Sequence, residues 1–185
     1  MALDAVKIIG GNPTVARVEN DFYPTPRGVI LALLCAEFGK IPCQILEPAC
    51  GDGALSKAMS ENGYSVTSAD LIYRGYGVGG VDFLKRQEQW DGGIITNPPF
   101  TLAQEFIEKG FEIGCTYLAL ILKSTYWHAY STRGRTFRRY PPAAIYALGW
   151  RPDFLGLKAP TMDVIWCVWR KDHNGPTTYD VLPKP

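Results

Sequence analysis

Short apolar segments alternate with segments of helical spacing along most of this chain, and this alternation constrains the fold more than any other feature. The segments predicted as strands are Gln44–Leu46, Tyr64–Ala69, Val81–Phe83, Asp91–Thr96, Thr116–Leu122, Ala143–Leu148 and Val164–Trp169. Helices are predicted over Arg27–Glu37, Ala54–Asn62 and residues 101–113. Strands that alternate with helices at this spacing indicate an α/β fold with a mostly parallel, seven-stranded sheet and helices on both faces.

The chain length of 185 residues fits one domain with a buried core. We expect a single domain over residues 21–173, an irregular segment over residues 1–20 and a proline-rich, frayed tail over residues 174–185. No apolar run reaches the roughly 20 residues that a membrane helix needs. The first residues also lack the pattern of a secretion signal. We therefore expect a cytoplasmic protein with no membrane anchor.

The first predicted helix carries a clear amino-terminal signal. Pro26 suits the first turn of a helix, because its missing N–H would have no partner there in any case. Thr25 is the expected N-cap, since a threonine hydroxyl can accept from a free N–H of the first turn. The apolar face of this helix is expected to hold Val29, Ile30, Leu33, Leu34 and Phe38.

Composition argues against several kinds of site. The five cysteines are scattered, odd in number and without a C-x-x-C pair, and the two histidines are far apart. A disulfide framework and a metal site are therefore not expected. The formal net charge of +1 does not by itself indicate a nucleic-acid-binding protein, so the local distribution of charge matters more.

Special residues follow the first three predicted strands, where open parallel sheets bind their ligands. A glycine turn within Glu47–Gly53 follows the first strand, Asp70 the second, and Asp82 the third. Carboxylates at these ends can accept hydrogen bonds from ribose hydroxyls and from an adenine amino group. A dinucleotide is the main alternative ligand, but its motif requires a third glycine where this chain has Ser56. Acidic residues within the turn would also repel a pyrophosphate, so a cationic cofactor is favoured.

The tetrapeptide Asn97-Pro98-Pro99-Phe100 follows the fourth predicted strand. An amide oxygen from Asn97 and a carbonyl from Pro98 could accept hydrogen bonds from a weakly nucleophilic amino group and direct its lone pair. The proline rings hold the backbone rigid, and Phe100 offers a flat face on which a planar group can stack. A simple proline turn is the alternative. The position after the glycine turn and both aspartates favours the chemical interpretation.

Together these motifs resemble the class I S-adenosylmethionine-dependent amino-methyltransferases of the DNA adenine-N6 type. Residues 21–26, Asp-Phe-Tyr-Pro-Thr-Pro, resemble the amino-terminal cofactor motif of that branch. The resemblance implies a Rossmann-like class I methyltransferase fold, S-adenosylmethionine as cofactor, and catalysis by Asn97, Pro98, Pro99 and Phe100. It further implies a cofactor site formed by Tyr23, Thr25, Glu47, Ala49, Gly51, Asp70, Leu71, Asp82, Phe83 and Asn97.

A basic and aromatic segment at residues 123–139 contains no acidic residue. Basic side chains can neutralise phosphates, and aromatic rings can stack on a base flipped out of a duplex. The alternative is a solvated loop with some aromatic residues in the core. Residues 149–162 are a second candidate for substrate contact. The residues expected to contact nucleic acid are Lys123, Tyr126, Trp127, Arg133 and Arg135.

The chain departs from sequence-specific enzymes of this branch, because no segment remains for a separate target-recognition region. We therefore expect relaxed specificity, a partner subunit that supplies recognition, or a substrate other than duplex DNA. The same motif also occurs in RNA and protein-glutamine methyltransferases, and a non-catalytic subunit with this fold is a further alternative. The compact form resembles small phage- or prophage-encoded methyltransferases, which implies a bacterial or phage-infected host cell.

Overall fold

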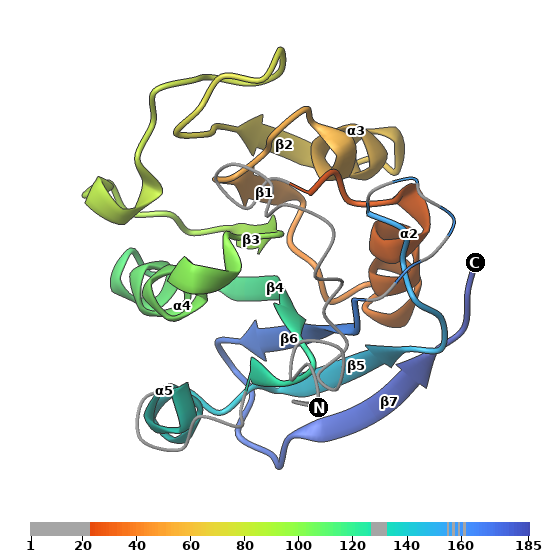
Figure 1. The fold of residues 1–185 in the computed structure, drawn as a ribbon. Helices are drawn as coiled ribbons and strands as arrows, with labels where there is room; N and C mark the ends of the chain where they lie inside the picture. Colours follow the sequence, from red (N-terminus) through yellow and green to blue (C-terminus); the bar gives the residue numbers. More distant parts are fainter. Residues whose placement is uncertain (1–22, 127–132, 155, 157, 159, 161) are drawn as a thin grey trace, which may run out of the picture.

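The computed structural model describes residues 23–126, 133–154, 156, 158, 160 and 162–185. Its centre is a seven-stranded sheet in the order β2-β1-β3-β4-β6-β5-β7 (Figure 1). β6 is antiparallel to both of its neighbours, and every other pair of adjacent strands is parallel. The predicted α/β fold with a mostly parallel sheet is confirmed. The strands are β1 (Gln44–Glu47), β2 (Ser65–Ser68), β3 (Gly93–Thr96), β4 (Tyr117–Lys123), β5 (Ala144–Leu148), β6 (Val164–Arg170) and β7 (Thr178–Leu182).

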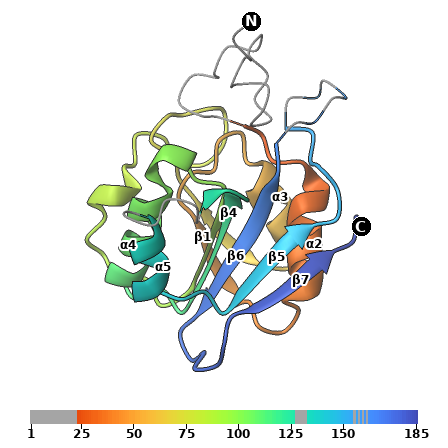
Figure 2. The same ribbon diagram turned by 60° about the horizontal axis from the view of Figure 1, so that its bottom comes forward.

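Helices cover both faces of the sheet, as predicted. α2 (Arg27–Ala36) and α3 (Ala54–Glu61) lie on one face, and α4 (Ala103–Glu112) and α5 (Arg133–Arg139) lie on the other (Figure 2). Side chains of β4 alternate between the two cores because successive residues of a strand point to opposite faces. Tyr117, Ala119 and Ile121 face α2 and α3, while Leu118, Leu120 and Leu122 pack on the α4 side.

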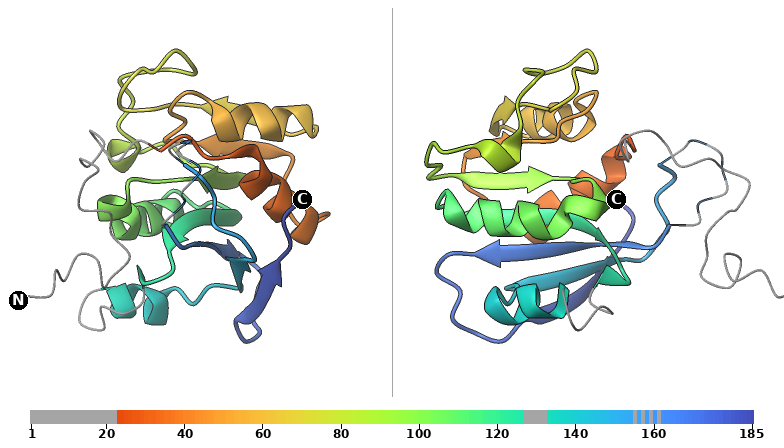
Figure 3. Two further views of the ribbon diagram at one scale, coloured as in Figure 1. Left: turned by 45° about the vertical axis from the view of Figure 1, so that its right-hand side comes forward. Right: turned by 60° about the vertical axis from the view of Figure 1, so that its left-hand side comes forward.

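The strand predicted at Val81–Phe83 is wrong. Asp82 instead caps a short 3₁₀ helix, Phe83–Lys85, by accepting a hydrogen bond from the Leu84 N–H at 3.1 Å. Only Phe83 of the three predicted residues is buried, so the segment has no core face to hold it in the sheet. The preceding residues, 71–80, form a loop that extends beyond β2 (Figure 3).

The prediction of a frayed carboxyl-terminal tail is also wrong, because Thr178–Leu182 forms β7 and pairs with β5 in parallel. The sheet thus reaches seven strands with a different member from the one predicted. β7 is an edge strand, and Leu182 is its only buried residue. The run Thr-Tyr-Asp-Val does alternate polar and apolar residues, but it is short and lies between Gly175-Pro176 and Pro183, and these breakers favoured the interpretation as a tail.

Two details of the first helix differ from expectation. Pro26 occupies the N-cap of α2, and no side chain caps the helix, so the Thr25 hydroxyl does not serve there. Phe38 is 85% exposed, because α2 ends at Ala36 and Phe38 lies beyond the helix. Glu37, the C-cap residue, is instead the one that turns inward, and the Arg170 guanidinium pairs with it at 2.6 Å.

The four strands β1 to β4 run parallel, so their carboxyl ends meet at one edge of the sheet. Glu47, Asp70, Asn97 and Lys123 all lie at or just beyond these ends. The antiparallel β6 begins at the same edge, where Val164 pairs with Lys123. Within the described residues, no helix is long and apolar enough to cross a bilayer.

Candidate active site

The turn between β1 and α3 fits closely against the loop that follows β2. Gly53 adopts a φ of +82°, and a Cβ atom there would lie 2.4 Å from the ring of Tyr76. Only glycine combines this left-handed backbone with so close an approach. Lys57 covers the Tyr76 ring at 4.9 Å from its centroid and donates to the Asp52 carbonyl at 2.8 Å. The glycine turn therefore has a fixed shape.

Asp70 ties the end of β2 to this turn. One carboxylate oxygen accepts from the Gly51 N–H at 2.8 Å, and the other accepts from the Ile72 N–H at 2.9 Å. The Asp70 backbone also donates to the Val78 carbonyl and accepts from the Val81 N–H. Since each carboxylate oxygen has two lone pairs, acceptor capacity remains for a ligand hydroxyl. The backbone bonds hold the carboxylate in place for this role.

Glu47 is 1% exposed at the end of β1. The Ser56 hydroxyl donates to its carboxylate, and Ser56 in turn contacts the Ser68 hydroxyl at 2.6 Å. The pKa of Glu47 is raised to about 8, chiefly by burial and also by the nearby carboxylates of Asp70 and Asp52, while the hydrogen bonds from Ser56 lower it. No lysine or arginine pairs with Glu47 within the described part of the chain. A positively charged ligand bound here would stabilise the ionised form of Glu47 and lower its pKa.

The Asn97 amide is held in one orientation. Its Nδ2 donates to the Tyr23 carbonyl at 3.3 Å and to the Thr25 hydroxyl oxygen at 3.1 Å. Its Oδ1 is buried and has no hydrogen-bond partner among the described residues. An unpaired buried acceptor costs about 1–3 kcal/mol, which a ligand with an N–H or O–H group would recover.

The two prolines of the motif differ in what their carbonyls do. The Pro99 carbonyl accepts from the Leu102 N–H at 2.8 Å and starts the short 3₁₀ helix Phe100–Leu102. No donor to the Pro98 carbonyl occurs among the residues with described positions. Phe100 is half-buried, and the Lys123 Nζ lies 5.0 Å from its ring centroid. The structure thus brings the predicted stacking ring and a predicted phosphate contact together.

Other predicted cofactor residues are dispersed. Ala49 is half-buried beside the turn, and Leu71 is exposed on the loop after β2. Asp82 caps its 3₁₀ helix and pairs with Lys85 at 3.2 Å. Phe83 is buried with its ring 4.9 Å from that of Phe106, so it belongs to the core beneath α4. Contacts between these residues and a cofactor stay predictions.

The predicted basic segment, residues 123–139, does not lie wholly at the edge of the sheet where the carboxyl ends of β1 to β4 meet. Tyr126 is buried against Phe137 of α5, so its ring belongs to the core. Arg135 is exposed on α5. Tyr140, just after α5, stacks on Phe111 at 4.3 Å and accepts from the Trp169 indole, which lies near the opposite edge of the sheet.

Two other residues were predicted to contact nucleic acid. Trp127 lies outside the described residues, and Arg133 is described only as the first backbone position of α5. Lys123 is therefore the predicted substrate residue that the structure places against the motif. Its position follows from β4, whose last residue it is.

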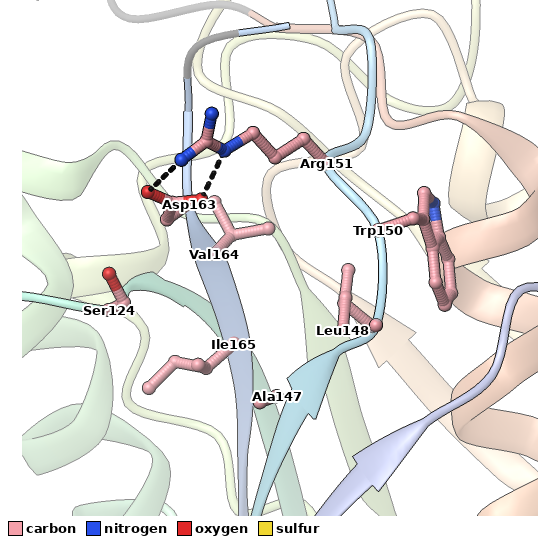
Figure 4. Close-up of a pocket in the computed structure, with 9 residues that line it drawn as sticks. Ser124, Ala147, Leu148, Trp150, Arg151, Asp163, Val164 and Ile165 are labelled. Atoms are coloured by element: carbon pink, nitrogen blue, oxygen red, sulfur yellow. Dashed lines mark hydrogen bonds and ion pairs between the residues drawn. The ribbon is translucent and has the colours of Figure 1, made fainter. Parts of the chain in front are cut away.

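A groove of about 390 Å³ lies between the ends of β5 and β6, beside Ser124 (Figure 4). Arg151 and Asp163 form a two-bond ion pair at its rim, at 2.7 and 3.3 Å, and the Trp150 indole is turned away from that pair. The groove contains part of the second stretch, residues 149–162, that the sequence suggested for substrate contact. Ser124, which lines the groove, follows Lys123 directly in the chain.

Comparison with known proteins adds information about the fold. No protein-family model matches the chain, and no curated protein matches it. A modification subunit of a putative type I restriction enzyme from Vibrio vulnificus YJ016 has a TM-score of 0.66 at 14% identity, over 89% of this chain and 48% of that one. A putative RNA methyltransferase from Pyrococcus horikoshii has a TM-score of 0.64 at 16% identity, over 85% and 90%.

A putative class I S-adenosylmethionine-dependent methyltransferase from Listeria monocytogenes has a TM-score of 0.60 at 15% identity, over 96% of this chain and 71% of that one. This chain has the class I methyltransferase fold. It spans about half the length of the Vibrio protein and of a type I methyltransferase subunit from Streptococcus thermophilus. At such low identity the similarity establishes the fold, and function must be argued from the site.

Within this methyltransferase fold, sequence reasoning missed two contacts of the site. One joins Thr25 to Asn97, and the other joins Lys123 to Phe100. Both connect residues that are distant in sequence, so no local pattern signals them. The helical spacing of α4 and the apolar run of β4 do predict that Phe100 and Lys123 lie at the same edge.

Proposed function

We propose that the protein is an S-adenosylmethionine-dependent methyltransferase that methylates an exocyclic amino group, with the N6 amino group of adenine in DNA as the first candidate. The observation that carries the proposal is the Asn97 amide. Its nitrogen is engaged by Tyr23 and Thr25, so its unpaired Oδ1 is left as an acceptor. An amino group supplies the N–H that such an acceptor requires.

The residues around the glycine turn fit this cofactor. S-adenosylmethionine, when bound, supplies a methyl group on a sulfonium cation. Glu47, without a cationic partner in the described residues, would line the positively charged part of the cofactor. Asp70 would hold the ribose hydroxyls, and Gly51 would let the ligand approach the backbone. The Tyr76 ring, which fills the space beside Gly53, would fix the shape of the turn around it.

The substrate amino group is held by two oxygen atoms in this proposal. Asn97 Oδ1 and the Pro98 carbonyl would accept its two N–H bonds, which directs the nitrogen lone pair toward the methyl donor. Phe100 would stack on the planar ring, and Lys123 beside it would contact a phosphate. The acceptors are fixed before the substrate arrives, so little reorganisation is needed during the reaction.

DNA is favoured by the resemblance of Asn97-Pro98-Pro99-Phe100 to the adenine-N6 branch. Two of the solved structures with this fold are also named as modification or methyltransferase subunits of type I restriction systems. A partner subunit that supplies target recognition is part of the proposal. RNA is the second candidate, supported by the similarity to the Pyrococcus horikoshii protein and to a 23S rRNA methyltransferase.

Transfer of a labelled methyl group to unmethylated DNA tests the proposal. Digestion of the DNA to nucleosides should yield labelled N6-methyladenine. The Asn97→Ala variant should abolish transfer and leave cofactor binding nearly intact, because the Oδ1 acceptor is lost together with only the two amide bonds to Tyr23 and Thr25. Asn174→Ala is the matched control, since Asn174 is exposed in the turn between β6 and β7 at the opposite edge.

Other outcomes of this assay select between the alternatives. If the label were found only in RNA or in protein, that macromolecule would be the substrate in place of DNA. Full activity of Asn97→Ala would contradict the proposed role of the amide. Tight cofactor binding with no transfer to DNA, RNA or protein would instead indicate a non-catalytic subunit.

A further inference from the structure

Thr25 is 6% exposed and its hydroxyl does not cap α2, although its position before the helix suggests that role. The hydroxyl oxygen instead accepts a hydrogen bond from Asn97 Nδ2 at 3.1 Å. Residues 25 and 97 are far apart in sequence, and the sheet edge brings them together. The buried hydroxyl therefore acts on the amide of the proposed catalytic motif rather than on its own helix.

The Tyr23 carbonyl fixes which end of the Asn97 amide faces the substrate. The Tyr23 carbonyl is an acceptor only, so the amide nitrogen must face it. That bond is 3.3 Å long, and the shorter bond to Thr25 lies beside it. With both acceptors on one side, the Oδ1 atom must point the other way, where it has no partner in the described residues.

The segment that presents these acceptors is firmly anchored. Residues 23–26 lead directly into α2, and the Val29 carbonyl of its first turn accepts from the Trp166 indole at 3.0 Å. Trp166 is fully buried in β6, near the centre of the sheet. The position of Thr25 is therefore set by the core, and the amide that it holds is set in turn.

We propose that Thr25 is a positioning residue: its hydroxyl holds the Asn97 amide in place, while the Tyr23 carbonyl turns the amide oxygen toward the substrate. This inference rests on the proposed methyl transfer to an amino group. A reversed amide would present two N–H donors and would suit a carbonyl or ether oxygen instead. The observed orientation therefore restricts the site to substrates that offer an N–H, such as an aromatic amine or a carboxamide.

The kinetic test compares Thr25→Val with Thr25→Ser at saturating cofactor and substrate. Valine keeps the shape without the acceptor, so kcat should fall about tenfold, in line with the loss of one well-placed hydrogen bond. Serine restores the acceptor and should return kcat to within about twofold of the parent, as expected when that bond is remade. Thr116→Val is the matched control, because the Thr116 hydroxyl makes one hydrogen bond, as a donor to the Gly92 carbonyl at 3.2 Å, and lies at the opposite edge.

Cofactor affinity separates this role from simple cofactor contact. In Thr25→Val the fall in kcat should exceed any rise in the dissociation constant of the cofactor, and the thermal midpoint should show that the variant is folded. A weakened cofactor affinity with an unchanged kcat would overturn the proposal, since Thr25 would then act on the cofactor and not on the amide.

A second measurement does not need activity at all. Hydrogen exchange of the Asn97 side-chain amide, followed by NMR, should accelerate in Thr25→Val and return to the parent rate in Thr25→Ser. Unchanged exchange in Thr25→Val would overturn this role of Thr25 whatever the kinetics show. If the parent protein transfers no methyl group to any substrate, the proposed function fails, while this exchange measurement still decides whether Thr25 holds the amide.

Discussion

At the scale of single residues, Glu47 couples the proposed cofactor site to the stability of the fold. Its carboxyl is buried, accepts from Ser56 and has a pKa of about 8 because burial disfavours the charged form. The unfolded chain loses this proton near the ordinary pKa of 4.5. Between these two values the folded state binds more protons than the unfolded state, so stability falls as the pH rises.

Glu47→Gln should remove this dependence, because glutamine stays neutral and can still accept from Ser56. Relative to the variant, the parent should lose free energy of unfolding steadily from about pH 4.5 to about pH 8, and level off outside that window. Urea unfolding across this range provides the measurement. Glu105→Gln, on an exposed position of α4, is the control and should follow the parent. Parallel curves for the parent and Glu47→Gln would contradict the assigned pKa.

At the same scale, the sequence predicted the positions of the polar site residues well and those of the aromatic residues poorly. The order of Glu47, Asp70 and Asn97 along the chain placed them at successive strand ends, and the structure has them there. Phe83 and Tyr126 show the limit, since an aromatic residue beside a motif can belong to the core. Whether such an aromatic side chain faces the site or packs in the core depends on tertiary packing, which no local sequence pattern contains.

At the scale of secondary structure, β1 to β6 could be predicted from the sequence, β2 included although none of its residues is buried, and β7 could not. β3 and β4 are apolar almost throughout, and their boundaries lie within two residues of the prediction. β7 has four exposed residues out of five, and its short alternating run lies between Gly175-Pro176 and Pro183, which indicated a tail. The Val81–Phe83 segment was misleading for the opposite reason, because its apolar ends suggested a strand that the Asp82 cap replaces.

Leu182 tests whether β7 belongs to the cooperative fold. Its side chain is 5% exposed and packs in the core on the α2 side of the sheet. Leu182→Ala should lower the free energy of unfolding by about 2–3 kcal/mol, at the low end for a buried leucine because the strand lies at an edge. Val181→Ala, at a position 50% exposed, is the control and should change stability by less than about 0.5 kcal/mol.

Denaturant unfolding followed by two probes gives the measurement. A tryptophan signal and a far-ultraviolet signal should shift together in Leu182→Ala if β7 unfolds with the rest of the sheet. Equal stability of Leu182→Ala and Val181→Ala would instead show that the strand contributes nothing to the fold.

At the scale of the whole molecule, positive charge is spread over both edges of the sheet. Lys123 lies beside Phe100 at the edge that holds the motif. The end of α5, with Arg138 and Arg139, lies near Tyr140 and therefore toward the opposite edge. A nucleic acid seated on the motif would thus meet Lys123 but not the basic end of α5. This arrangement favours weak binding by the chain alone and a partner subunit that adds contacts.

The salt dependence of DNA binding measures how many phosphates the chain contacts. Each neutralised phosphate adds about −0.9 to the slope of log K against log salt concentration. With Lys123 and a small number of neighbours at this edge, we expect a slope of about −2 to −3, which is far shallower than the slope of about −10 known for a strong DNA-binding protein. Fluorescence anisotropy with a labelled duplex, at several salt concentrations and with the cofactor present, would determine it.

Lys123→Gln should then reduce the magnitude of that slope by about one and weaken binding to all sequences alike, since a phosphate contact carries no sequence information. Lys171→Gln is the matched control, because Lys171 is exposed just beyond β6 at the opposite edge. Equal slopes for the parent and Lys123→Gln would show that Lys123 contacts no phosphate. A slope as steep as that of a strong DNA-binding protein would show that the chain needs no partner to hold its substrate.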